Sequence, residues 1–192
     1  PRLRVVRSDR HPPITVLDRQ GDTSPAIAVV VYRLTEPVVQ LAWAAWLELE
    51  LERLGLHARV SAHAGAFVVS VAHEAPDVAL RSVVAALHAE VRPSPELHDR
   101  LRARAAARRN AEPHDARNHA CTGELVWPSE LRLDEPTLAT LTPRIEAHRR
   151  GALARERVSL GLVAPEPLAT RATEALHAGP SWPSTTAAID ER

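Results

Sequence analysis

Apolar side chains recur along this chain with two different spacings. In some segments they alternate with polar residues or form short β-branched runs, which is typical of strands; in others they recur every three or four residues, which is typical of amphipathic helices. The strand pattern occurs at Ile14–Leu17, Ala26–Leu34, His57–Ala62, Ala66–Ala72 and Arg157–Val163. The helix pattern occurs at Val38–Leu54, Val78–Val91, Glu96–Arg109, Asp115–Val126, Pro136–Gly151 and Pro165–Ala178.

Glycine, proline and aspartate mark the boundaries of these elements. We expect Gly55 to end the first helix and Gly65 to form the turn of a hairpin between two strands. Asp77 is expected to cap the next helix. Pro143 is expected either inside the Pro136–Gly151 helix or in the first turn of a second helix capped by Thr142.

The order of elements predicts an α+β fold. Antiparallel hairpins with helices packed on one face give a two-layer domain with a mostly antiparallel sheet. No repeat of 20–50 residues is present, which argues against a solenoid. We expect an N-terminal arm at 1–13, a single domain at 14–179 and a loose tail at 180–192.

Composition narrows the class of partner. Acidic and basic residues balance at 24 each, so no net field recruits nucleic acid or an anionic membrane. Every basic residue is Arg, and Lys and Met are absent, which is typical of a GC-rich bacterial genome. Because the chain begins at Pro1, we expect a fragment or a processed form.

The location predicted from the sequence is the cytoplasm. Cys121 is the one cysteine, so no internal disulfide can form, and a reducing compartment fits. No apolar run approaches the roughly 18–20 residues that span a bilayer. Residues 1–10 carry basic side chains, but no apolar segment follows them as in a signal peptide.

An ordered set of local patterns carries a resemblance to a known family. The passage Leu49–Ala62 joins a helix to a hairpin through a Gly-Leu pair, and Val158–Leu168 joins a strand to a helix through a Pro-Glu-Pro link. Three intervening segments also fit, at Val78–Leu87, Ser94–Ala103 and Ala116–Trp127. From Pro13 to Gly179 the chain resembles one α+β half-unit of the pitrilysin/insulinase/mitochondrial-processing-peptidase family of zinc metallopeptidases.

The catalytic motif of that family is missing. Catalytic half-units bind zinc through H-x-x-E-H on the first helix, where two His ligate the metal and the Glu acts as general base. The corresponding helix, Val39–Glu50, has no His, and the motif occurs nowhere in the chain. The resemblance therefore implies a non-catalytic half-unit with no cofactor of its own and with zinc in its partner.

The same resemblance supplies candidate contacts to substrate. Non-catalytic halves often contribute a Tyr and an Arg, which by position would fall near Ala58 and Leu51, and neither is present. Arg53, His57 and Arg59 lie nearby and are the candidate substrate-binding residues.

Two tryptophans on the first helix are candidates for a partner interface. Trp43 and Trp46 lie three residues apart, on one helix face. Core packing is the ordinary interpretation of such a pair, and a partner-facing patch is the more specific one, because Trp is enriched at interface hot spots.

Other groups of residues are weaker candidates for a functional site. The densest set of possible metal ligands is His114, Asp115, His119 and Cys121, but its two His are five apart, which is poor spacing for one helical face. His73–Glu74 is interpreted as a turn pair. The arginines of residues 100–109 are interpreted as a solvated helix face, because one Tyr and one Phe provide few stacking platforms for nucleic acid.

The functional hypothesis is a non-catalytic subunit or domain that pairs with an H-x-x-E-H-bearing metallopeptidase. Together they would enclose a chamber for a peptide substrate, which the sheet edge at 57–71 could hold by strand addition. By family analogy the pair would trim leader peptides of ribosomal natural products. The alternatives are a stand-alone binding or scaffold module, and an enzyme with a site around 114–121.

Overall fold

The computed structural model of the chain describes residues 2–19, 24–109, 125, 128 and 132–184. Its strands are β1 (Arg2–Val6), β2 (Ile14–Asp18), β3 (Ala26–Tyr32), β4 (Ala58–His63), β5 (Ala66–Ala72) and β6 (Val158–Ala164). Its helices are α1 (Pro37–Arg53), α2 (Pro76–His88), α3 (Pro95–Arg109), α5 (Glu135–Ala152) and α6 (Glu166–His177), with a short 3-10 turn at Arg155–Arg157. The α+β class is confirmed. The predicted order holds for the described elements from β2 to α6, but β1 was not predicted.

The strands form one mixed sheet in the order β1-β2-β6-β3-β5-β4. Neighbouring strands are antiparallel except β2 and β6, which run parallel. Residues 64 and 65 connect β4 to β5, and Gly65 has a φ of +77°. This left-handed conformation suits glycine in a tight hairpin turn.

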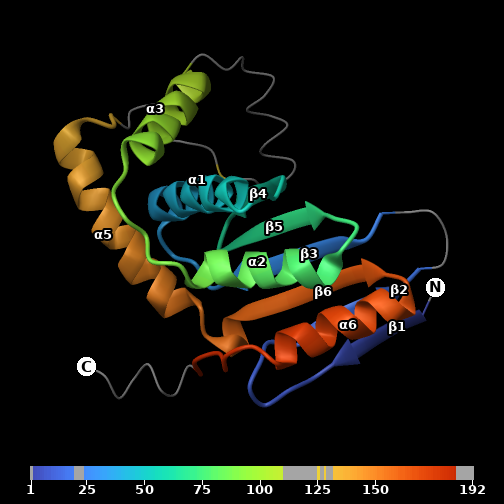
Figure 1. The fold of residues 1–192 in the computed structure, drawn as a ribbon. Coiled ribbons are helices and arrows are strands. Elements are labelled where there is room, and N and C mark those ends of the chain that lie inside the picture. Colours follow the sequence, from blue (N-terminus) through green and yellow to red (C-terminus); the bar gives the residue numbers. More distant parts are fainter. Residues whose placement is uncertain (1, 20–23, 110–124, 126–127, 129–131, 185–192) are drawn as a thin grey trace.

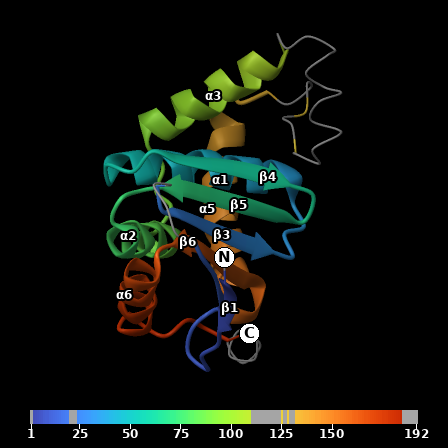
Figure 2. The same ribbon diagram turned by 90° about the vertical axis from the view of Figure 1, so that its right-hand side faces the viewer.

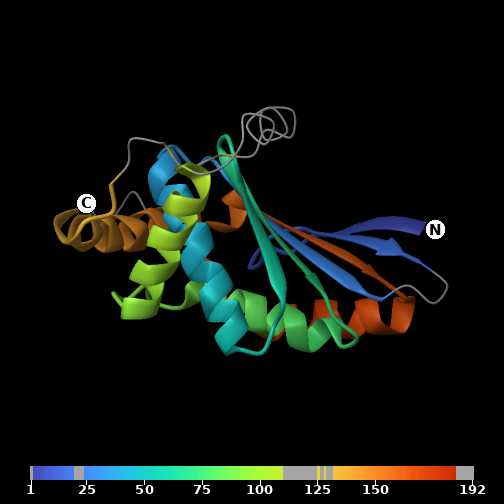
Figure 3. The same ribbon diagram turned by 90° about the horizontal axis from the view of Figure 1, so that it is seen from above.

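The helices all lie on one side of the sheet, as Figures 1 and 3 show. Helices α2 and α6 run side by side across one face of the strands, and the turned view of Figure 2 shows the same layer edge-on. Every second residue of the central strands points into this layer and is buried, as in Ile27, Val29 and Val31 of β3. Period-two alternation therefore gives the sheet one core face.

Helix α1 is enclosed on all sides over its middle turns. All nine residues from Val39 to Leu47 are buried, which a helix on a protein surface cannot achieve. Strand β4 and helices α2, α3 and α5 contact it. Its ends match the prediction: Pro37 occupies the first turn, and the chain leaves the helix through Gly55, with a φ of +75°.

The structure corrects the predicted N-terminal arm and tail. Residues Arg2–Val6, expected to form an arm, pair antiparallel with β2 and become an edge strand of the sheet. The tail begins with an anchored segment, because Trp182 is buried and its backbone N–H donates to the Arg10 carbonyl. Residues 185–192 lie outside the described part.

One helix start differs from expectation. Asp77 does not cap α2; it lies in the first turn, after Pro76, and its carboxylate lies 3.3 Å from Arg171 and 3.7 Å from Arg81. Of the two alternatives for Pro143, the first is correct: it lies inside a continuous α5, whose N-cap residue Asp134 accepts a hydrogen bond from Thr137 N–H. The helix predicted at 115–126 falls outside the described residues.

No helix in the described ranges combines the length and the apolar character that a membrane span requires.

Candidate functional site

Helix α1 occupies the place where the resemblance puts a zinc motif, and its side chains make a core instead of a metal site. Gln40 is 1% exposed, and its Nε2 donates to the carbonyl of His63 at 2.6 Å and to that of Ala66. These bonds fasten α1 to the β4–β5 turn. Trp43 packs edge-on against Phe67, with ring centroids 4.5 Å apart.

This arrangement removes access as well as ligands. A catalytic helix must present its metal and its general base to a substrate, whereas the middle turns of α1 are buried throughout. An amide and two indoles cannot replace imidazole and carboxylate ligands. The residues of α1 therefore do not fit a zinc site.

The other metal and dyad candidates have different outcomes. Among the described residues no three His, Cys, Asp or Glu side chains gather as a metal site would require. The cluster at His114–Cys121 lies outside the described residues. His73 follows its predicted role in a turn, because its Nδ1 accepts a hydrogen bond from Ala75 N–H at 3.0 Å.

The three candidate substrate contacts do not converge. Arg53 ends α1 and pairs with Glu96 at 2.5 Å and Glu50 at 3.4 Å. His57 is exposed in the turn that follows α1. Arg59 is exposed on β4 and points to the face of the sheet opposite to the helices. Substrate binding by these residues stays a prediction.

The interface predicted at the two tryptophans is wrong. Trp43 and Trp46 are 0% and 3% exposed, so neither offers a surface to a partner. The alternative of core packing is correct. Sequence spacing could not separate the two, because α1 is enclosed by helices that come much later in the chain.

The edge of β4 is partly closed by the chain itself. The ladder with β5 turns the backbone groups of Ala58, Val60 and Ala62 outward. The carboxylate of Glu48 accepts the outward N–H of Val60 at 3.1 Å, and Leu125 N–H donates to the outward carbonyl of Ala62 at 2.7 Å. Strand addition at β4 would have to displace both contacts.

Glu48 is itself held by α3. Arg104 pairs with its carboxylate, and Arg100 lies 3.9 Å from it while binding Glu52 through both guanidinium nitrogens. The hydrogen bond from Arg100, against a smaller opposing effect of burial, lowers the pKa of Glu52. The arginines of α3, interpreted from the sequence as a solvated face, thus include two that fasten α3 to α1.

The face of the sheet opposite to the helices is uncovered within the described part of the chain. Its outward side chains on the four central strands are neither buried nor charged. They are Thr15 and Leu17 of β2, Ser159, Gly161 and Val163 of β6, Ala26, Ala28, Val30 and Tyr32 of β3, and Ala66, Val68, Ser70 and Ala72 of β5. We call this set the open face. A face that stays in water normally carries polar and charged residues, whereas this one has no charge and only three polar residues, Thr15, Ser70 and Ser159.

A signal for the open face was present in the sequence. Ala26–Tyr32 is apolar at every position, and such a run predicts a strand covered on both sides. The structure covers one side.

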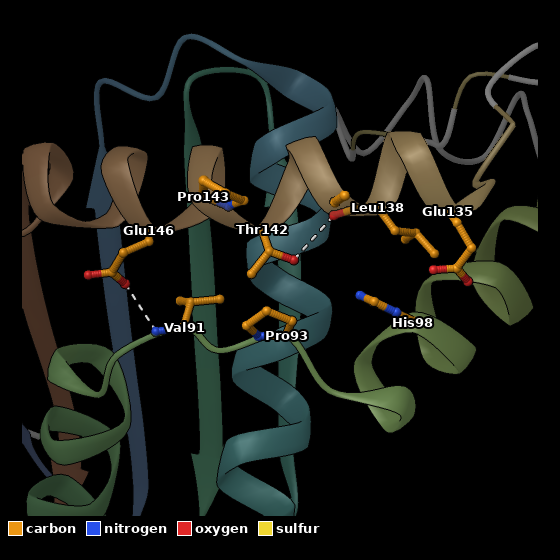
Figure 4. Close-up of a pocket in the computed structure, with 9 residues that line it drawn as sticks. Val91, Pro93, His98, Glu135, Leu138, Thr142, Pro143 and Glu146 are labelled. Atoms are coloured by element: carbon orange, nitrogen blue, oxygen red, sulfur yellow. Dashed lines mark hydrogen bonds between the residues drawn. The ribbon is translucent and has the colours of Figure 1, made fainter.

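Figure 4 shows a pocket of about 400 Å³ between α5 and the segment that joins α2 to α3. Glu146 lies at one end and accepts a hydrogen bond from Val91 N–H at 3.0 Å. Burial pushes the pKa of Glu146 up, but hydrogen bonds from Arg149, Val91 N–H and Arg150 outweigh it and lower the pKa to about 2. The carboxylate is thus a fixed anion that locks α5 to the α2 end, a structural role.

Comparison with known proteins supports the fold. No protein-family profile matches the sequence, and no curated protein is detectably similar to it. Among solved structures, the inactive domain of an M16 peptidase from Pseudomonas fluorescens superposes with a TM-score of 0.61 and 12% identity, over 95% of this chain and 52% of that one.

Two further structures give the same result. A chain of complex III2 from Candida albicans, with Inz-5 bound, matches with a TM-score of 0.69 and 9% identity, over 94% of this chain and 47% of that one. A protease from Helicobacter pylori matches with a TM-score of 0.61 and 8% identity, over 94% and 51%. This chain thus spans about half the length of each structure. Its fold is the α+β half-unit fold found in M16 peptidase domains.

Proposed function

We propose that this chain is a non-catalytic half-unit that pairs with an H-x-x-E-H-bearing metallopeptidase unit and helps to enclose its peptide substrate. The open face is the observation that carries the proposal. Thirteen outward positions on four strands carry no charge. Ten of the thirteen are apolar, and contiguous apolar patches on a protein surface often mark an interaction surface.

The shape of the open face suits a packed partner element. Gly161 and Ala28 lie side by side at its centre, where a Cβ on Gly161 would come 3.5 Å from that of Ala28. Small residues there leave a shallow surface on which the backbone of a second unit can approach closely. The solved structures of this fold are about twice as long as this chain, so they have room for a second unit of similar size.

The enclosed position of α1 accounts for a non-catalytic role of this unit beside a catalytic partner. Because α1 is part of the core, hydrolysis falls to the partner, and zinc is expected there. This chain would contribute a wall of the chamber. In its most specific form the proposal makes the pair a processor of leader peptides, which rests on the family analogy.

Co-expression tests the pairing. The chain is co-expressed with the H-x-x-E-H-bearing protein encoded nearest to it, and the two are analysed by size-exclusion chromatography with light scattering. We expect one complex, which Ala28→Arg on the open face abolishes. The matched control is Ala147→Arg, an exposed position on α5 that should leave the complex intact.

Activity provides the second measurement. The complex should cleave a precursor peptide faster than the partner alone, as followed by mass spectrometry. Separate elution of the two proteins, with equal cleavage by the partner alone, would refute the proposal and favour a stand-alone binding or scaffold module.

A further inference from the structure

The second edge of the sheet, β1, is open, whereas the edge at β4 is partly closed. Leu160 N–H donates to the Pro13 carbonyl, so the odd-numbered residues of β2 bond with β6 and its even-numbered residues face β1. In the β1–β2 register, even residues of β1 pair with even residues of β2. Leu3 and Val5 therefore turn their N–H and C=O groups outward, and within the described residues nothing bonds to them.

The side chains of β1 alternate in character. Leu3 and Val5 are 65% and 50% exposed and lie on the same side of the sheet as the open face. Arg2 and Arg4 point to the other side. The edge thus offers backbone hydrogen bonds in its plane, apolar contacts on one side and positive charge on the other.

The arginines of this segment have no carboxylate partner among the described residues. Arg2, Arg4 and Arg7 are without an ion pair there, whereas Arg100 and Arg104 of α3 are bound by glutamates. Three unpaired guanidinium groups in six residues favour an acidic partner. They also oppose pairing of two copies of β1, since a continuous antiparallel sheet would set Arg against Arg.

We propose that β1 accepts an extended strand of a partner polypeptide in which acidic and apolar residues alternate. The backbone of this strand pairs with Leu3 and Val5. Its carboxylates lie beside Arg2 and Arg4, and its apolar side chains extend the open face beyond Leu3. The proposal does not depend on zinc or on peptidase activity, and β4 is less suited to the same role because Glu48 and Leu125 occupy two of its outward backbone groups.

Peptide titration followed by ¹⁵N NMR tests this directly on the chain alone. The probe is Glu-Val-Glu-Val-Glu-Val-Glu, and the matched control peptide carries Lys in place of Glu. With the acidic probe we expect saturable chemical-shift changes at the Leu3 and Val5 amides and none at Ala58 or Val60. The affinity for the probe should fall at higher salt, because salt screens the attraction between its carboxylates and the arginines. The Lys peptide should bind at least about tenfold more weakly, because it faces arginines.

A backbone variant separates strand pairing from simple charge attraction. Val5→Pro removes one outward N–H without touching the β2 ladder, and proline is tolerated on such an edge. The Val5→Pro variant should bind the acidic probe at least about tenfold more weakly than the natural chain does. Val5→Thr keeps the N–H and should bind the probe as the natural chain does. Circular dichroism of both variants confirms that they remain folded.

Three results would overturn the proposal. One is the absence of shifts at Leu3 and Val5 up to millimolar probe. The second is equal binding by Val5→Pro and Val5→Thr, which would indicate charge attraction only. The third is stronger binding of a uridine oligonucleotide than of the acidic peptide, which would make β1 a nucleic-acid surface. Because the titration contains no peptidase partner, its failure is distinct from a failure of the pairing through the open face.

Discussion

Replacing Gln40 with leucine tests whether α1 is a structural helix fastened to the sheet by hydrogen bonds. The Gln40 amide is buried, and its two donor contacts reach carbonyls on both sides of the β4–β5 turn, at His63 and Ala66. Leucine has a similar size and removes the donor while leaving both carbonyls in place. The substitution therefore isolates the hydrogen bonds from packing.

The expected loss follows from the net worth of the two hydrogen bonds. His63 and Ala66 also pair with each other in the β4–β5 ladder, so each carbonyl keeps one partner when the Gln40 donor is removed. A lost hydrogen bond costs about 0.5–1.5 kcal/mol, and the added apolar burial of leucine offsets part of the sum. We expect Gln40→Leu to lower the free energy of unfolding by about 1–2 kcal/mol. Gln40→Glu should cost more, because it sets a carboxyl group against two carbonyl oxygens in a buried site.

Urea unfolding followed by circular dichroism measures these losses. With an m-value of about 2–3 kcal/mol per molar, the midpoint of Gln40→Leu should fall by roughly 0.5 M at unchanged slope. Ala147→Leu, which adds an apolar group to an exposed position of α5, is the control and should leave the midpoint unchanged. An unchanged midpoint for Gln40→Leu would show that the turn carbonyls are solvated and that α1 is more accessible than the structure indicates.

Four other outcomes follow from the packing and the charges. Trp43→Ala should destabilise the fold by about 3–5 kcal/mol in urea unfolding, because it empties a fully buried site against Phe67; a loss under 1 kcal/mol would contradict core placement. Glu48→Ala should speed amide exchange at Val60, measured by hydrogen–deuterium exchange, and Glu48→Gln should do so less because it keeps an acceptor; equal rates in all three proteins would disprove the edge contact. The pKa of Glu146 is lowered from 4.5 to about 2 in the fold, so its contribution, of order 3 kcal/mol at neutral pH, should disappear as pH falls from about 4.5 towards 2; Glu146→Gln should flatten that part of the stability profile, and an unchanged profile would exclude this role. Burial, aided by the charges of His177 and Arg10, lowers the pKa of His11, so its neutral form belongs to the fold and stability should decline as pH drops below about 6.5; a His11→Gln variant with the same pH profile as the natural chain would rule this out.

The fold was predictable because its signals are local. Ala66–Ala72 was predicted with the bounds that β5 has in the structure, since a near-continuous apolar run between a glycine and a proline leaves few alternatives. β1 was missed because its arginines alternate with apolar residues in a segment rich in charge, and its strand conformation depends on β2 as a neighbour.

The site was less predictable because it depends on contacts between distant segments. The absence of H-x-x-E-H is a property of the sequence. The enclosure of Trp43 and Trp46 depends on α3 and α5, which lie 49 or more residues further along the chain, and no spacing within α1 reveals it. Likewise, the acceptor of the Val60 N–H is Glu48, which in the sequence is one of several glutamates on a helix.

The sequence by itself thus determined most strands and helices, the class of fold and the lack of a zinc motif, because periodicity, turn residues and ligand types are properties of short segments. Only the tertiary structure decided which surfaces remain open. Burial and edge exposure depend on which elements pack together: α1 is enclosed, Glu48 binds one backbone group of the β4 edge, and among the described residues the open face and β1 stay uncovered.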